Sequence, residues 1–346
     1  MILTVKKNFL WFLLLSVPLA LIVGNRGDTN DTFTYYSIFK NINYYNLTNF
    51  SDFYLETGVE LGWGLYSKII SLFSNSEVVL FTIFSLLTFY FIYKTSDIIK
   101  LKFIYVMCFY LPTGFFLMQQ FMQIRQGFAV PVVIYASFLY LENKKLLAIL
   151  FFSLAVLFHQ TVIVYILFLF VFLLIYKYFF EENKPLNFKI YMISILLLGI
   201  IFSRVVFLPL ALSFFSRLQS YANTDYAESV SLLGLANIKF YIEFIFILLF
   251  MNKKDLNDKF LIYMIFIFTI GLAIRIAFFD FAILSGRLSN VFLFIEIFLM
   301  PYFIYKRFSK MVLFLSLLFY FILVGFISWN FQVAEYLADS YFSPLY

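Results

Sequence analysis

Two polar clusters that could do chemistry flank an apolar stretch of the chain. The first combines four glutamines with one arginine, in the run Gln119-Gln120-Phe121-Met122-Gln123-Ile124-Arg125-Gln126. The second is Phe158-His159-Gln160, which contains the only histidine of the 346 residues. A guanidinium and several amides can bind an anion, and an imidazole can accept a proton. The two clusters predict a polar site inside a hydrophobic protein.

The composition is that of a membrane protein. Hydrophobic residues make up 64% of the chain and charged residues only 13%, whereas soluble domains contain about 25% charged residues. At roughly 20 residues per span, we expect an all-α polytopic bundle of about 11 transmembrane helices, in the range 10–12. No long polar stretch separates a second domain, so residues 1–346 are expected to form a single membrane domain.

The order of apolar segments predicts the topology. They cover 8–24, 76–93, 102–118, 127–141, 146–158, 161–176, 190–207, 237–251, 260–275, 287–305 and 311–328. Sixteen of the 25 Lys and Arg residues fall in the N-terminal tail or in alternate connections, as expected if these are cytoplasmic. The N-terminus is then cytoplasmic, and the outer loops are about 25–75, 208–236 and 276–286. Within the first loop, apolar residues at helical spacing over 58–73 predict an amphipathic interfacial helix.

Arginine is distributed differently from lysine. Six of the seven arginines lie in the outer half, and they are Arg26, Arg125, Arg204, Arg217, Arg275 and Arg287. Because guanidinium binds phosphates through a bidentate fork, this asymmetry indicates an anionic ligand that arrives from outside. Interfacial snorkelling is the alternative, and it could explain Arg204 and Arg217 individually.

The segment between Lys145 and Lys177 predicts a helical hairpin. One helix through its 31 residues would be about 46 Å long, which exceeds a hydrocarbon core of about 30 Å. Two short helices with a turn at His159-Gln160 fit better and would put His159 in a pocket below the outer surface. An interior hydrogen-bonded histidine is the alternative reading.

Other polar residues in apolar segments have competing interpretations. Gln119, Gln123 and Gln126 are spaced i, i+4 and i+7, which predicts a ligand-facing side of one helix or a polar interhelical seam. Lys239 and Glu243 are four residues apart and could form a structural pair. Glu296 has no partner close in sequence and is a candidate functional carboxylate. Cys108 is the single cysteine, so neither a disulfide nor a metal-ligand set is expected.

Several short motifs occur in a fixed order. They are the Asp-rich opening Arg26-Gly27-Asp28 to Asp31 with Tyr35-Tyr36, then Glu60-Leu61-Gly62, Ile124-Arg125-Gln126-Gly127-Phe128-Ala129, Leu154-Ala155-Val156-Leu157-Phe158-His159-Gln160, and Arg287-Leu288-Ser289 before Met300-Pro301-Tyr302. In these motifs the chain resembles the EpsG-like branch of the Wzy-type polysaccharide polymerases of bacterial envelopes.

The resemblance implies an activity and a fold. Such an enzyme transfers an oligosaccharide repeat unit from an undecaprenyl-diphosphate donor to another lipid-linked unit, on the outer face of the bacterial cytoplasmic membrane. It is similar to the metal-independent, glycosyltransferase C-like enzymes of many helices and needs no cofactor. Its partners would be these lipid-linked oligosaccharides and the bilayer, with a flippase and a chain-length regulator of the same pathway as candidates, and no nucleic acid.

The expected roles follow from this chemistry. His159, Arg125 and Glu60 are the candidate catalytic residues, with His159 as base or acceptor-orienting group. Glu60 and Asp28 would hold sugar hydroxyls or share the role of the base. The candidate substrate-binding residues are Arg26, Asp28, Gln123, Gln126, Arg217, Arg275 and Arg287. A flippase for lipid-linked sugars would also use intramembrane arginine, but flippases are expected to show paired half-repeats, which are not seen in this sequence. A membrane acyltransferase that modifies glycans is a third interpretation.

Overall fold

The computed structural model describes residues 7–27, 29, 31–179, 185–209, 229–282 and 284–333. The chain divides into two compact units. Unit 1 comprises Met1–Ile166 and Met311–Tyr346, and unit 2 comprises Leu167–Lys310. Each unit is considered separately below. A single membrane domain over the whole chain stays a prediction.

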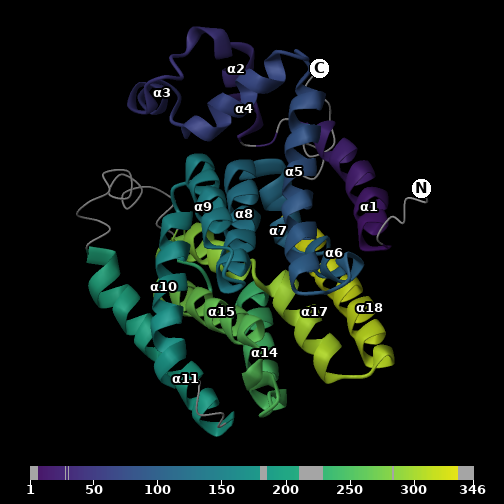
Figure 1. Cartoon of the computed structure of the whole chain (residues 1–346), viewed down its shortest axis with the longest axis vertical. Helices are drawn as coiled ribbons and strands as arrows, with labels where there is room; N and C mark the ends of the chain where they lie inside the picture. Colours follow the sequence, from purple (N-terminus) through teal and green to yellow (C-terminus); the bar gives the residue numbers. More distant parts are fainter. Residues whose placement is uncertain are drawn as a thin grey trace. The chain divides into compact units, whose positions relative to one another are not determined.

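All regular structure in the described ranges is helical (Figure 1). Six helical segments are long and apolar enough to cross a membrane, and a bent pair, Leu284–Leu293 with Glu296–Arg307, would make a seventh. The six are Lys7–Gly24, Glu77–Ile98, Ile124–Leu141, Asn187–Phe207, Lys259–Ala277 and Lys310–Asn330. Each apolar segment expected from the sequence coincides with a helix or a broken helix, while the number of about 11 spans stays a prediction.

Unit 1 is built around α8 (Ile124–Leu141), in which 89% of the span is buried. It packs against α9 (Lys145–Phe158) and α5 (Glu77–Ile98), and α5 packs against α1 (Lys7–Gly24) (Figure 1). The helix α6 (Phe103–Tyr110) contacts α1 and α5, and α18 (Lys310–Ile327) also belongs to this unit. Buried Phe, Ile and Val side chains fill the space between these helices.

The segment 25–75, predicted to be an outer loop, contains three helices, α2 (Thr32–Lys40), α3 (Phe50–Thr57) and α4 (Leu61–Ser71). They form a layer across one end of the α8–α9 pair (Figure 1). The expected amphipathic helix is confirmed as α4, which buries Trp63 and exposes Ile69. The sequence did not predict α2 and α3 as helices.

The glutamine-rich run is not one helical face, so that prediction is wrong. The short helix α7 (Gly114–Leu117) continues into the π-helix η2 (Met118–Met122), and Gln123 leaves helical geometry with φ −88° and ψ 50° before α8 starts. At Gly127, an added Cβ would collide with the Gln119 carbonyl, so the π-helix η2 lies directly against α8. Gln119 and Gln126 therefore sit on different elements.

The helix break expected at His159-Gln160 is confirmed, while the hairpin and the depth of His159 below the outer surface stay predictions. Helix α9 ends at Phe158, His159 is extended with φ −160° and ψ 119°, and α10 (Val162–Phe179) begins two residues after Gln160. Helix α10 continues from unit 1 into unit 2.

Unit 2 is organised around α15 (Lys259–Ala277), in which 83% of the span is buried. It contacts α11 (Pro185–Phe202), α16 (Ser289–Leu293) and α17 (Glu296–Arg307), and α14 (Leu235–Phe250) contacts α17. The expected span 287–305 is broken, with a bend of 41°. Most of the expected loop 208–236 lies outside the described residues, whereas the loop near 276–286 is present between α15 and the π-helix η6 (Leu284–Leu288).

The approach of α4 to α9 depends on Gly62. A Cβ there would lie 2.5 Å from the Leu157 carbonyl oxygen, which is backbone and cannot rotate away. We expect Gly62→Ala to lower the free energy of unfolding by about 1–3 kcal/mol, because overpacking forces a shift of the backbone. Thermal unfolding of the detergent-solubilised protein would measure the change.

Gly286→Ala is the matched control, since no atom lies within 4 Å of a Cβ at Gly286. Its stability should be unchanged or slightly higher, because alanine restricts the unfolded chain more than glycine. Equal unfolding temperatures for the two variants would contradict the proposed close contact.

Candidate functional site

Glu60 occupies the N-cap position of α4 and has extended backbone geometry, with φ −68° and ψ 149°. A carboxylate at a helix N-terminus is favoured by the helix dipole. Because Gly62 lets α4 press against the last turn of α9, the Glu60 side chain reaches the residues that follow α9. It is only 6% exposed there.

His159 meets Glu60 at the turn between α9 and α10. The His159 Nδ1 atom lies 3.5 Å from Glu60 Oε1 and 3.5 Å from Thr161 Oγ1. The backbone N–H of Gln160 donates to Glu60 Oε1 at 3.4 Å. The histidine side chain is 23% exposed. The irregular turn therefore presents an imidazole and an N–H group to one carboxylate.

Arg125 joins the same carboxylate from the first turn of α8. Its Nη1 forms an ion pair with Glu60 Oε2, and its Nε donates to the Tyr35 hydroxyl at 3.1 Å. Tyr35 belongs to α2, and its ring packs against Trp63 with centroids 5.0 Å apart. The Arg125 side chain is 18% exposed. We call Tyr35, Glu60, Arg125 and His159 the Glu60 cluster.

The Glu60 cluster contains all three residues predicted to be catalytic. They come from positions 60, 125 and 159 and meet because four chain segments pack together within unit 1. Glu60 and Arg125 form an ion pair, and the imidazole of His159 lies beside the same carboxylate. The arrangement provides an anion-binding guanidinium, a carboxylate and a candidate base, while the catalytic roles stay predictions.

The predicted binding residues near this cluster lie in different environments. Gln123 is half-buried at the break before α8, and Gln126 is buried in the first turn of α8. Arg26 is 4% exposed and donates to the backbone carbonyls of Val23 and Phe121, at 3.0 and 3.1 Å. Its guanidinium also lies 4.2 Å from the centre of the Phe81 ring. Burial lowers the pKa of Arg26 to about 9, so it keeps its charge at neutral pH.

Arg26 thus ties α1 to the π-helix η2 in this structure, and a role in substrate binding stays a prediction. Asp28 and Arg217 lie outside the described residues. Two other predicted binding residues belong to unit 2. Arg275 Nε donates to Asn237 Oδ1, and Arg287 is exposed on η6.

Two partners were missed by sequence reasoning. Tyr35, which accepts a hydrogen bond from Arg125, was quoted only as part of the Tyr35-Tyr36 motif and was given no role. In unit 2, Lys239 forms its ion pair with Glu296 at 2.5 Å, not with Glu243 as the i, i+4 spacing suggested. Within the described ranges, no group of three or more His, Cys, Asp or Glu side chains could hold a metal ion.

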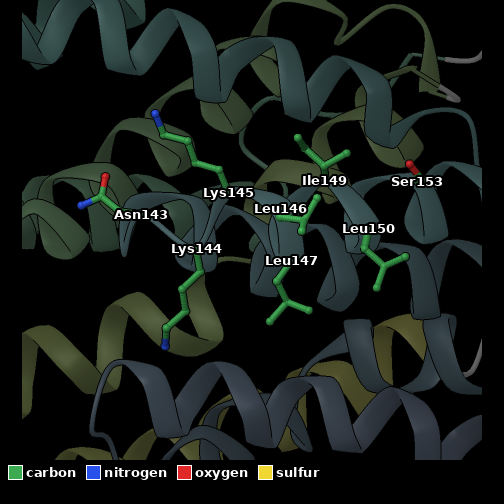
Figure 2. Close-up of a pocket in the computed structure, with 8 residues that line it drawn as sticks. All are labelled: Asn143, Lys144, Lys145, Leu146, Leu147, Ile149, Leu150 and Ser153. Atoms are coloured by element: carbon green, nitrogen blue, oxygen red, sulfur yellow. The ribbon is translucent and has the colours of Figure 1, made fainter.

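A shallow groove in unit 1 lies at the opposite end of α9 from His159. It is lined by Lys144, Lys145 and the aliphatic side chains of the first turns of α9 (Figure 2). Most of these side chains are exposed, including Leu146 at 85%. In the predicted topology this is the cytoplasmic end of α9, so the groove is separate from the Glu60 cluster.

Comparisons with known proteins identify the class. Residues 9–342 match the EpsG family, and the chain belongs to that family. Together with its apolar helices, this indicates an integral membrane protein. No solved structure matches it.

A relative is the amylovoran biosynthesis protein AmsC of Erwinia amylovora. It is 32% identical over 180 residues, which cover 50% of this chain and 46% of that protein. The similarity therefore spans about half the length of this relative.

The Glu60–Arg125 ion pair predicts how the free energy of unfolding changes in two single variants and in the double variant. Removing one partner of a buried pair leaves an uncompensated charge and typically costs about 3–5 kcal/mol. Glu60→Gln and Arg125→Gln should each destabilise the protein to a similar extent, while the double variant should lose much less than the sum. Equilibrium unfolding in detergent, followed by tryptophan fluorescence, measures all four proteins.

The matched control is the exposed Lys144–Glu142 pair, with an N–O distance of 2.8 Å and a lysine side chain that is 58% exposed. Lys144→Gln should cost only about 0–1 kcal/mol, because water screens surface pairs. Additive losses for Glu60→Gln and Arg125→Gln would show that the two side chains do not depend on each other.

Proposed function

We propose that this protein is a polysaccharide polymerase of the bacterial cell envelope. It joins oligosaccharide repeat units carried on undecaprenyl diphosphate, by glycosyl transfer on the outer face of the cytoplasmic membrane. The observation that carries the proposal is the meeting of Arg125, Glu60 and His159 in one partly buried cluster. Membership of the EpsG family supports the same reaction class.

Arg125 is suited to stabilise the leaving group. Glycosyl transfer breaks the bond between the anomeric carbon and the diphosphate oxygen, and the electron pair stays on the diphosphate. A preorganised guanidinium in a site that excludes water stabilises such developing charge strongly. The hydrogen bond from Nε to Tyr35 fixes the plane of the fork, so the remaining N–H groups can bind phosphate oxygens in a defined direction.

His159 is suited to be the general base. With a proton on Nδ1, facing Glu60 and Thr161, the lone pair on Nε2 can accept the proton of the acceptor sugar hydroxyl. The acceptor oxygen then forms the new bond to the anomeric carbon. Glu60 would hold the imidazole in this tautomer and stabilise the imidazolium that forms.

The ion pair suggests an exchange of partners during the reaction. Without substrate, Glu60 neutralises Arg125. A bound diphosphate competes with Glu60 for the guanidinium, and the released carboxylate can turn fully to His159, which lies 3.5 Å away. Donor binding would thereby strengthen the base that the acceptor needs. The cluster would thus become active only when the donor is in place.

The remaining parts of the proposal concern topology and partners. The N-terminus is cytoplasmic, the Glu60 cluster faces the periplasm or exterior, and about 11 spans form one glycosyltransferase C-like membrane domain that works without a metal. Glu60 and Asp28 would contact sugar hydroxyls. The arginines at 26, 217, 275 and 287, with Gln123 and Gln126, would bind the lipid-linked substrate, which a flippase delivers and a chain-length regulator monitors.

Substitutions in the Glu60 cluster should separate these roles. Arg125→Lys keeps the charge but loses the fork, and we expect a loss of about 10²–10³-fold in the rate of glycan lengthening. His159→Ala removes the base and should cost about 10²–10⁴-fold. The assay follows the lengthening of a lipid-linked glycan by the purified protein in liposomes, with the amount of folded protein measured in parallel.

Glu56→Gln is the control, because Glu56 is exposed and lies in the same outer segment, outside the cluster. Its activity should equal that of the unchanged protein. If folded Arg125→Lys and His159→Ala both polymerise at the parental rate, the site assignment is wrong. If lipid-linked glycans cross the liposome membrane without new glycosidic bonds, the protein is a flippase.

A further inference from the structure

Unit 2 contains a buried carboxyl group to which no described side chain or backbone group donates a hydrogen bond. It belongs to Glu243, in the middle of α14. The residue is 5% exposed, and both carboxyl oxygens are inaccessible to water. A buried carboxylate normally gathers donors or a counter-ion, because an isolated ionised carboxylate is very costly in an apolar environment. Among the described residues, Glu243 lacks the hydrogen-bond donors that an ionised carboxylate would need.

The nearest cation is already used by another carboxylate. Lys239 lies one helical turn before Glu243, but its Nζ binds Glu296 Oε1 at 2.5 Å. Glu296 comes from α17, is 0% exposed, and lies beside Glu243. Two carboxyl groups thus adjoin one ammonium group. If both were ionised, one negative charge of the three groups would remain uncompensated.

Within the described residues, the other cation beside α14 interacts with Glu296 and forms no ion pair with Glu243. Arg275 of α15 donates from Nε to Asn237, and its guanidinium carbon lies 5.4 Å from the centre of the Phe240 ring. It interacts electrostatically with Tyr241 and Glu296, and within the described residues it forms no ion pair with Glu243. Further along α14, Phe246 packs against Phe303 and Phe308, so that part of the interface is aromatic.

Protonation of one carboxyl group would remove the repulsion between Glu243 and Glu296. Two ionised carboxylates can only accept hydrogen bonds, so they repel each other when they are adjacent. If one of them is protonated, it becomes a donor to the other, and the repulsion turns into a hydrogen bond. Since Lys239 stabilises the charge on Glu296, Glu243 is the group that should carry the proton.

We propose that Glu243 and Glu296 form a proton-binding site within the membrane part of unit 2, with Glu243 protonated at neutral pH and hydrogen-bonded to the Glu296 carboxylate. The ligand is a proton, and Lys239 is the fixed counter-ion. The Lys239 side chain is 20% exposed, so the edge of the site lies near the surface of unit 2. This inference does not depend on the proposed polymerase activity.

Infrared spectroscopy of the purified protein in D₂O tests the proposal directly. A protonated carboxyl group has a C=O stretching band that is separate from the carboxylate bands. We expect this band at neutral pH in the unchanged protein, its loss in Glu243→Gln, and its retention in the exposed control Glu56→Gln. Glutamine has nearly the shape of a protonated glutamate, so Glu243→Gln should fold. Identical spectra for the unchanged protein and Glu243→Gln would overturn the proposal.

Labelling with a hydrophobic carbodiimide tests the site without any substitution. Such reagents add to protonated carboxyl groups in apolar surroundings, and peptide mass spectrometry maps the product. Glu243 should be labelled at neutral pH and progressively less as the pH rises, while Glu56 should stay unlabelled.

Glu296→Gln should remove the labelling of Glu243, because Lys239 then becomes the counter-ion of Glu243 and favours its ionised form. Labelling of Glu243 that does not change with pH or with Glu296→Gln would contradict a shared proton.

Discussion

The ion pair between Glu60 and Arg125 is the interaction on which the arrangement of unit 1 depends. Its Glu60 side chain is only 6% exposed, so either charge alone would be costly there. The pair forms only if α4, α8 and the turn after α9 come together, and each approach has a visible cause. Gly62 lets α4 contact the Leu157 backbone, Gly127 lets the π-helix η2 lie on α8, and Tyr35 fixes the Arg125 side chain. The pair therefore links helix packing to the chemistry of the cluster.

Several elements of unit 1 could be predicted from local sequence features. The lysine distribution and the length of the apolar run from Leu146 to Tyr176 required a hairpin, and the turn lies at His159-Gln160 as expected. Apolar spacing identified α4, and the Glu60-Leu61-Gly62 motif has a physical meaning, since it places a carboxylate at the start of the helix that the glycine allows to pack closely. These features depend on span length and short-range periodicity, both of which can be recognised in a single sequence.

The partners of the charged side chains could not be predicted in the same way. Spacing of i, i+4 suggested a pair between Lys239 and Glu243, but Lys239 binds Glu296, which is 57 residues away. Similarly, nothing in the sequence predicted that Arg26 donates to the Phe121 carbonyl, 95 residues away. The π-helix η2 also has no sequence signature, and it separates Gln119 from Gln126. In each case the outcome depends on which groups tertiary packing brings within a few ångströms.

The two ionic clusters differ in how their charge can change. In the Glu60 cluster, a partly exposed guanidinium and imidazole share one carboxylate, so an incoming anion can replace Glu60 at Arg125 while the carboxylate turns to the imidazole. Around Glu243 and Glu296, the carboxyl groups are almost fully buried, and the only ligand small enough to enter without rearrangement is a proton. An ion pair that has access to the surface can exchange partners, whereas an enclosed one can only exchange protons. By this reasoning, the Glu60 cluster of unit 1 is suited to bind an anionic substrate, whereas the proposed site in unit 2 would change its net charge only by protonation.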